Sequence, residues 1–405
     1  MSTPVPEVLP PLSPVAPAER VELLDIFRGF ALLGVLIANM RGFNGPMVAY
    51  FDHTLMWQEP VNRGVQFLVD MFVSGKFITI FSFLFGIGFA IQMERAASRP
   101  PGFLGRRYGF LLGLGAVHMF LLWWGDILLT YAVFGFALLL FRNRQPKTLL
   151  WWALGLYLWP LVMFGAGALA SVLVADFPQQ PPVKPEELAR VIRVYATGSY
   201  LEILPERFKE AGTGLAFIPA FGPRLLGIFL LGLWVWRRGI LRDLGSHREA
   251  LVRWQWWGVA VGLPLAVGGE AFMLVAKPNP AQPSPAALLY FVVVSLAVPA
   301  LSLFYLATVT RLAAAPGWHG VVAHFAPVGR MALTNYLMQT LVCTGIFYGY
   351  GLGLYGKVGT LAGLALSLGI FAGQMVVSRI WLQRFGQGPA EAAWRWVTYA
   401  RWRRG

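Results

Sequence analysis

Charged residues are scarce in this chain, and cysteine is almost absent. Only 13% of the 405 residues are charged, whereas 57% are hydrophobic. Soluble globular proteins carry roughly 25% charged residues, so the deficit argues against a water-soluble fold. The single cysteine, Cys343, excludes an internal disulfide and a thiolate metal cluster, and we expect no metal site.

The hydrophobic residues gather in runs near the roughly 20 residues that a helix needs to cross a bilayer. In hydrocarbon every backbone N–H and C=O must be paired internally, and runs without strict alternation do not suit a barrel. The sequence therefore predicts an all-α, polytopic integral membrane bundle of about ten transmembrane helices. The expected spans are residues 24–42, 70–92, 108–124, 127–141, 149–174, 214–236, 254–275, 286–310, 329–347 and 359–381, with an interfacial helix at 58–72.

Positive charge alternates across these spans. Arginines concentrate in the segments after every second span and in the C-terminal segment, while the opposite loops hold few. The positive-inside rule then places both ends of the chain in the cytoplasm. Because the arginines cluster at the ends of the spans, we attribute the net charge of +14 to membrane topology and contacts with anionic lipids rather than to nucleic-acid binding.

Outside the spans we expect three further parts. Residues 1–19 are rich in proline and lack a signal-peptide pattern, which indicates a disordered cytoplasmic tail before a membrane domain at 20–382. Residues 383–405 form a basic cytoplasmic tail. The external loop 176–213 contains an amphipathic helix, interpreted either as an interfacial cap or as a lid over a substrate entrance.

Ionisable residues within spans are costly, so each is a functional candidate. Asp25, Arg28 and Asn39 lie three and eleven residues apart in the first span and share one stripe. Asp25 and Arg28 are spaced for an ion pair at the cytoplasmic mouth, although the pair also suits a role that only fixes the helix end. Asn39 would extend a polar path toward the outer face.

A histidine and an aspartate flank the turn between the third and fourth spans. His118 lies about 9 Å below the outer end of its helix, and Asp126 follows at the turn. A carboxylate that orients a histidine makes it a general base. The alternatives are a packed His118 and an Asp126 that only caps the next helix. His53, in an outer loop, is a second base candidate or a solvated loop histidine.

Several other polar residues fall inside predicted spans. They line a common cavity, or they form hydrogen bonds between helices, which is the commoner role. Asn335 and Gln339 are four residues apart and share a face, and the remaining members are Lys76, Arg224 and Glu270.

Five segments resemble a known family. They are LLDIFRGFALLGVLIANM, SGKFITIFSFLFGIGFA, HMFLLWWGDILLTYAVFG, GRMALTNYLMQT with FYGYGLGLYG, and RFGQGPAEAAWRWVTY. Together they resemble the YeiB-like bacterial inner-membrane proteins, a domain of unknown function. That family is distantly similar to transmembrane acyltransferases of the heparan-α-glucosaminide N-acetyltransferase type. The similarity rests on the first-span pattern, here Leu24-Asp25, Arg28-Gly29 and Asn39.

The resemblance implies an acyl group taken from cytosolic acetyl-CoA and passed to an acceptor across the membrane. In those acyltransferases the active-site histidine follows the asparagine. His53 is the nearest counterpart, but its spacing and flanking residues match poorly, which leaves His118 as the preferred base. Asn39 would supply an oxyanion donor.

We therefore expect an acyltransferase that uses acyl-CoA as co-substrate and a lipid-linked, sugar or other extracytoplasmic hydroxyl or amine acceptor. Arg28, Arg106 and Arg107 would hold the CoA phosphates at the cytoplasmic mouth. One alternative is an exporter of a small polar metabolite, which would use the same polar stripe as its path. Another is a scaffold whose basic tail binds lipid or a partner, and a homodimer fits any of the three.

Overall fold

The computed structural model describes residues 22–51, 56–96, 102–174, 177, 184–240, 248–280 and 282–399. Throughout these ranges the regular structure is helical and no strand occurs, so the predicted all-α membrane bundle is confirmed. The predicted tail 1–19 and the candidate base His53 lie outside the described residues.

The helices follow the apolar runs of the sequence. In chain order they are α1 (Glu22–Asn44), α2 (Met47–Phe51), α3 (Pro60–Phe72), α4 (Lys76–Ala96), α5 (Gly102–Val117), η2 (His118–Leu122), α6 (Leu128–Leu138), η3 (Leu139–Phe141), α7 (Pro146–Leu173), α8 (Pro185–Thr197), α9 (Tyr200–Arg237), α10 (Arg248–Ala276), α11 (Pro285–Ala314), α12 (Pro316–Ala323), α13 (Ala326–Arg330), α14 (Ala332–Phe347), α15 (Thr360–Phe385) and α16 (Pro389–Tyr399).

All ten predicted spans are helical, but they differ in length. Seven helices within the described ranges are long and apolar enough to cross a membrane. The predicted spans at 108–124, 127–141 and 329–347 correspond to shorter helices: α5 and α14 have 16 residues each, and α6 has 11. Because a full crossing takes about 20 residues, the number ten stays a prediction.

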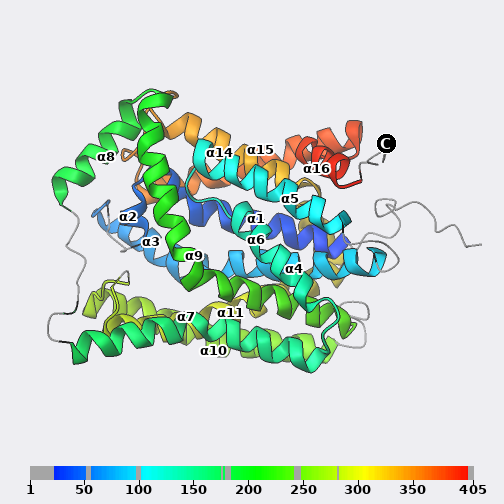
Figure 1. Ribbon diagram of the computed structural model, residues 1–405. Helices are drawn as coiled ribbons and strands as arrows, with labels where there is room; N and C mark the ends of the chain where they lie inside the picture. The colour runs from blue at the N-terminus through cyan, green and yellow to red at the C-terminus, as the bar shows by residue number, and fades with distance from the viewer. Residues whose placement is uncertain are drawn as a thin grey trace, which may run out of the picture.

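Two groups of helices pack along a common axis (Figure 1). In one group α10 packs along α11 and α7 along α9, and α4 joins this group to α1 through contacts with both α9 and α1. In the other, α1 contacts α13, α14 and α15, while α16 packs on α5. The first residues of α1 and the whole of α16 lie at the same end of the bundle, called here the α16 end, and α8 lies at the opposite end, called the α8 end (Figure 1).

Helix α1 occupies the centre of the second group because small residues let its neighbours approach. A Cβ added to Gly29 would lie 2.0 Å from the carbonyl oxygen of Phe325, and one added to Gly329 would lie 1.9 Å from that of Asp25. Glycine at both positions is what allows α1 and α13 to cross in backbone contact. The crossing positions Asp25 beside α13 at the α16 end.

Helix α9 includes the second half of the predicted loop 176–213. A capping box formed by Ser199 and Glu202 starts the helix at Tyr200, and it continues for 38 residues to Arg237. The second half of the predicted loop is therefore the first part of one long helix, which has prolines at 205, 219 and 223 in its interior. Each proline removes a backbone donor and favours a bend, and α9 runs in two directions in Figure 1.

Candidate functional site

His118 and Asp126 meet inside the bundle. Nδ1 of His118 lies 2.7 Å from Oδ2 of Asp126, and both side chains are fully buried. The other carboxylate oxygen, Oδ1, accepts a hydrogen bond of 2.7 Å from the backbone N–H of Leu129 at the start of α6. Asp126 thus contacts the histidine with one oxygen and caps the start of α6 with the other. The two alternatives considered for it, a partner of His118 and a helix cap, occur together.

The local backbone explains how these two residues meet. Helix α5 ends in one π-helical turn, η2, which begins at His118 and closes with a hydrogen bond from the N–H of Trp123 to the carbonyl of His118. Such π-turns are rare and occur frequently at functional sites. A Cβ on Gly115 would lie 2.2 Å from the nitrogen of Leu129, so only glycine lets α5 and α6 approach here.

Helix α14 supplies the second partner of the imidazole. Nε2 of His118 lies 2.8 Å from the hydroxyl oxygen of Thr340, whose side chain is buried. The ring of Tyr336, one helical turn earlier, lies 5.2 Å from the ring of His118. The Tyr336 hydroxyl accepts a hydrogen bond from the N–H of Ile127. Four elements, namely η2, the turn before α6, α6 itself and α14, therefore enclose the histidine.

This arrangement has the parts of a general-base site. A carboxylate at Nδ1 fixes the ring and stabilises the imidazolium, which leaves Nε2 facing a hydroxyl group. A hydroxyl and a carboxylate on opposite sides of a histidine, here 2.8 Å and 2.7 Å from its two ring nitrogens, are the combination that activates an oxygen nucleophile. Thr340 occupies the place of that hydroxyl in this structure.

A cavity of about 520 Å³ enters the bundle from the α16 end. Its outer part carries charged residues, and its inner part is lined mainly by apolar and aromatic side chains. The charged members are Asp25, Arg28, Glu94, Arg107, Arg330, Glu391 and Arg395, and the apolar and aromatic lining includes Phe81, Leu84, Phe85, Phe89, Leu111, Leu128 and Tyr131. The cavity therefore suits an amphiphilic molecule with an anionic head.

Some of the charged residues at this mouth form ion pairs and others do not. Asp25 and Arg28 form an ion pair of 2.7 Å, as their spacing predicts. Arg107 packs flat on Trp394 of α16, with 3.6 Å between the guanidinium carbon and the ring centre. Among the described residues no carboxylate forms a salt bridge with Arg107, Arg330 or Arg395, and the four arginines of the lining outnumber its three carboxylates by one.

Helix α16 forms one wall of the cavity. Oε1 of Glu391 accepts hydrogen bonds from the backbone N–H groups of Leu333 and Thr334, which begin α14. The indole N–H of Trp394 donates to the carbonyl of Arg107 over 2.9 Å. Part of the predicted basic tail 383–405 is thus a docked helix that completes the mouth. The preceding helix, α15, ends at Phe385, where Gly386 adopts a left-handed conformation with φ 72°.

The inner end of the cavity stops beside the histidine. Tyr336, Ile127 and Leu128 line it there. Tyr336 also packs against His118, so one aromatic ring separates the cavity from the buried pair. The side chain of Tyr336 therefore lies between the cavity and the histidine.

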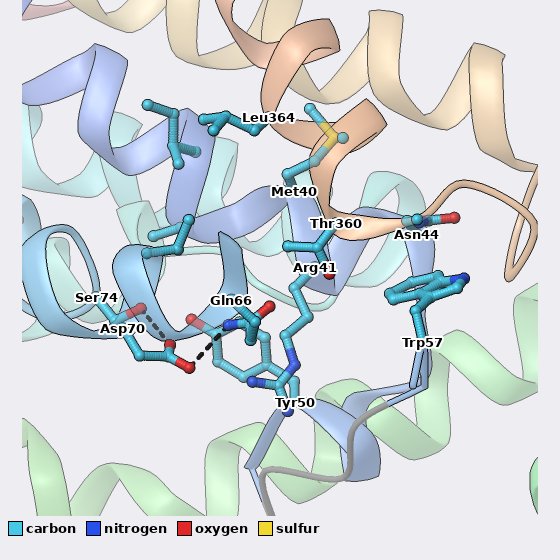
Figure 2. A pocket seen from close by; sticks show the side chains of 15 residues that line it. Met40, Arg41, Asn44, Tyr50, Trp57, Gln66, Asp70, Ser74, Thr360 and Leu364 are labelled. Carbon is cyan, nitrogen blue, oxygen red and sulfur yellow. Dashed lines mark hydrogen bonds between the residues drawn. The ribbon is translucent and has the colours of Figure 1, made fainter. Parts of the chain in front are cut away.

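A second, smaller cavity of about 110 Å³ lies near the other end of α1 (Figure 2). Figure 2 shows Asp70 hydrogen-bonded to Ser74 and Gln66, each over 2.8 Å, with Arg41 and Tyr50 on the neighbouring wall. Helix α1 lines both cavities, with Asp25 and Arg28 at one and Arg41 and Asn44 at the other.

The other predicted catalytic and phosphate-binding residues fall in different places. No hydrogen bond or ion pair joins the half-buried Asn39 to His118 in the described part of the chain. Arg28 and Arg107 line the cavity, whereas the guanidinium of Arg106 donates to the carbonyl of Thr398 at 3.2 Å and does not line it. Of the predicted set, the structure brings together His118 with Asp126, and Asp25 with Arg28 near Arg107.

The polar residues predicted to line a cavity hold helices together and line neither of the two cavities. The amide of Asn335 donates to Ser378, and that of Gln339 to Gln374, each over 2.9 Å and each joining α14 to α15. The guanidinium of Arg224 donates to the hydroxyl of Ser295 at 2.6 Å. Nζ of Lys76 donates to the carbonyl of Asp70 at 2.7 Å.

Comparisons with known proteins give relatives along the whole chain. A family model described as "Protein of unknown function (DUF418)" matches residues 235–401. The chain is 35% identical over 416 residues to "Uncharacterized protein YxaH" of Bacillus subtilis (strain 168), covering 96% of this chain and 97% of that protein. It is 30% identical over 404 residues to "Uncharacterized protein YeiB" of Escherichia coli (strain K12), covering 94% and 96%.

Proposed function

The chain belongs to the YeiB-like family, since two relatives at 30% identity or more align with it almost end to end, and we propose that it is a membrane acyltransferase. In this proposal an acyl-CoA enters the cavity at the α16 end. The acyl group then passes to a hydroxyl or amine of an acceptor held near His118. The observation that carries the proposal is the cavity with an arginine mouth that ends one aromatic ring from a carboxylate-oriented histidine.

The mouth supports binding of the donor. Guanidinium groups bind phosphate oxygens with charge-assisted hydrogen bonds, often in pairs. Arg107, Arg330 and Arg395 lack carboxylate partners and line the mouth, while the inner wall is apolar. The CoA phosphates would bind at the mouth, and the acyl thioester would lie along the inner wall.

His118 and Asp126 support the chemical step. The acceptor O–H or N–H gives its proton to Nε2 of His118 as the oxygen or nitrogen attacks the thioester carbonyl carbon. The carbon–sulfur bond then breaks, and the departing thiolate takes the proton from the imidazolium. Rotation of the Tyr336 side chain connects the cavity with His118 in this scheme.

The same reasoning proposes a location. Arginines that flank spans gather on the cytoplasmic side, and Arg107, Arg330 and Arg395 lie at the α16 end. We place this end in the cytoplasm of a bacterium and the chain in its inner membrane, where acyl-CoA is available on the side of the larger cavity.

Binding of acyl-CoA tests the proposal. Detergent-purified protein is titrated with acetyl-CoA and palmitoyl-CoA by calorimetry, with Arg107→Ala and the matched control Arg142→Ala, an exposed arginine that does not line the cavity. Saturable binding that weakens in Arg107→Ala and not in Arg142→Ala supports the donor site. A folded protein that binds neither thioester overturns it.

One observation favours a second candidate, a transporter of a small polar metabolite. Helix α1 lines a cavity near each of its ends, so a solute path along this helix would have an opening toward each end of the bundle. The two candidates differ at His118. A transporter in proteoliposomes keeps its solute flux in His118→Gln, whereas an acyltransferase loses transfer.

A further inference from the structure

Arg207 is a buried guanidinium with incomplete pairing. It lies in the second turn of α9 at the α8 end, and it has no solvent exposure. Nη1 donates to the carbonyl oxygen of Leu121, but Nε and Nη2 have no hydrogen-bond partner among the residues that the structure describes. Guanidinium has five N–H donors and stays charged, and buried charges are otherwise found paired and hydrogen-bonded. Arg207 therefore lacks acceptors that a ligand can supply.

The two carboxylates closest to Arg207 along α9, Glu206 and Glu210, are already engaged, and Glu206 pairs with Arg190 over 2.7 Å. Oε2 of Glu210 accepts a hydrogen bond of 2.5 Å from the hydroxyl of Tyr195, and Oε1 accepts one of 3.3 Å from the N–H of Met47. Within the described residues no salt bridge joins Glu210, or any other carboxylate, to Arg207. In the part of the chain that the structure describes, the guanidinium has no counter-charge within salt-bridge distance.

Aromatic rings complete the surroundings. The guanidinium carbon of Arg207 lies 5.3 Å from the ring centre of Tyr200 and 5.7 Å from that of Tyr348. Tyr355 packs against Tyr348 with 5.7 Å between ring centres, and its buried hydroxyl is also without a partner. The cluster of Arg207, Tyr200, Tyr348 and Tyr355 thus has spare donors, and an oxyanion is the ligand that provides matching acceptors.

This cluster is attached to the turn that carries His118. Leu121, whose carbonyl binds both Arg207 and the hydroxyl of Tyr200, belongs to the same π-turn as His118. Tyr348 directly follows α14, the helix of Thr340. The cavity with the arginine mouth reaches the histidine from the α16 end, whereas Arg207 reaches the same turn from the α8 end.

We propose that Arg207, assisted by the hydroxyl of Tyr355, binds an oxyanion of the acceptor substrate, a carboxylate or a phosphate. Its assignment to the acceptor rests on the proposed acyl transfer, while the binding of an oxyanion does not. The ring centres of Tyr200 and Tyr350 are 5.8 Å apart, and Tyr350 is 41% exposed, so the cluster borders on the surface of the protein.

Anion-dependent stability tests the site. Thermal unfolding of the detergent-purified full chain is measured in sodium acetate, sodium phosphate and sodium chloride at equal ionic strength. Arg207→Met is compared with Arg224→Met, which removes a mostly buried guanidinium that has partners in Tyr157 and Ser295. We expect acetate or phosphate to raise the melting temperature of the wild type and of Arg224→Met, and this shift to vanish in Arg207→Met. The anion that gives the shift identifies the acceptor group as a carboxylate or a phosphate.

A milder variant covers the case in which Arg207→Met does not fold. Tyr355→Phe removes only the unpartnered hydroxyl. We expect it to raise the dissociation constant of the anion by roughly three- to tenfold, the effect of one hydrogen bond. Equal shifts in chloride and in both oxyanions, or a full shift retained in Tyr355→Phe and Arg207→Met, overturn the site. Oxyanion binding by a protein that binds no acyl-CoA keeps the site and overturns its role in acyl transfer.

Discussion

Nδ1 of His118 and Oδ2 of Asp126 lie 2.7 Å apart with neither side chain exposed. The pair joins the π-turn after α5 to the turn before α6, and Gly115 lets α5 and α6 themselves approach in backbone contact. Because the carboxylate occupies Nδ1, the basic nitrogen is Nε2, on the side of α14. In this geometry Nδ1 binds the carboxylate, and Nε2 is the nitrogen that can accept a proton.

Asp126→Asn should leave the donor cavity intact and impair the histidine. An amide does not stabilise the imidazolium as a carboxylate does, so we expect acyl transfer to fall by roughly 100-fold to 10,000-fold. The dissociation constant of acetyl-CoA should change little, because Asp126 does not line the cavity. Parallel titrations and CoA-release rates check this, and equal rates in the two proteins would be the contrary result.

Thr340→Val removes the partner of Nε2 and keeps the shape of the side chain. Leaving a buried polar atom unpaired costs about 1–3 kcal/mol, so the free energy of unfolding should fall by that amount. Thr344→Val is the matched control, since Thr344 is also buried on α14, one turn further, and does not contact His118. Thr340→Ser should restore stability. Unfolding in detergent measures all three, and similar losses for Thr340→Val and Thr344→Val would contradict the special role of Thr340.

Arg330→Ala should weaken binding of acyl-CoA at the mouth. The loss of one hydrogen bond to a charged group costs about 1.5–3 kcal/mol, which corresponds to roughly 10-fold to 150-fold in the dissociation constant. The loss should shrink at high salt where the group is solvent-exposed. Calorimetry at two salt concentrations measures it. An unchanged affinity would exclude Arg330 from phosphate binding.

Gly329→Ala should destabilise the crossing of α1 and α13. The new Cβ would lie 1.9 Å from the carbonyl oxygen of Asp25, so the helices must separate, and overpacking of this kind costs typically about 1–3 kcal/mol. Gly317→Ala in α12 is the control, because no atom lies within 4 Å of its added Cβ. Melting temperatures in detergent should fall for the first variant only. A stable Gly329→Ala would show that this crossing is looser than described.

The contact between α8 and α9 should weaken in acid. Hydrogen bonds from Arg190 of α8 and Lys209 of α9 lower the pKa of Glu187 to about 2. Since the folded pKa lies below the ordinary value of 4.5, the stabilisation is present above pH 4.5 and is lost as the pH falls toward 2. Amide exchange in α8, corrected for intrinsic rates, should therefore accelerate in this window. Glu187→Gln should show no such change, and an identical acceleration in that variant would refute the assignment.

The helical runs and the pairing of His118 with Asp126 could be predicted because both depend on nearby sequence. Apolar length identifies a span, and a tight turn brings the ends of adjacent helices together. Asp25 and Arg28 were predictable for the same reason, through their spacing on one helix. In each case the information lies within about ten residues of chain.

The partners from distant segments could not be predicted. Thr340 lies 222 residues from His118, and periodicity gives no register between separate helices. Arg207 falls in the amphipathic helix predicted within the external loop 176–213, and its contact with Leu121 depends on the packing of α9 against the π-turn. The contact of Trp394 with Arg107 arises only when α16 folds back on α5. Asn39 shows the converse, since a shared stripe on α1 did not bring it to His118.

The most direct test of acyl transfer is release of free CoA from acetyl-CoA by the protein in proteoliposomes, with candidate hydroxyl and amine acceptors inside. The wild type should release CoA with turnover, and His118→Gln should bind acetyl-CoA with wild-type affinity yet release it at the background rate. Equal release by the two proteins, or saturable binding without release for any acceptor in the lumen, would contradict His118 as the base of an acyltransferase.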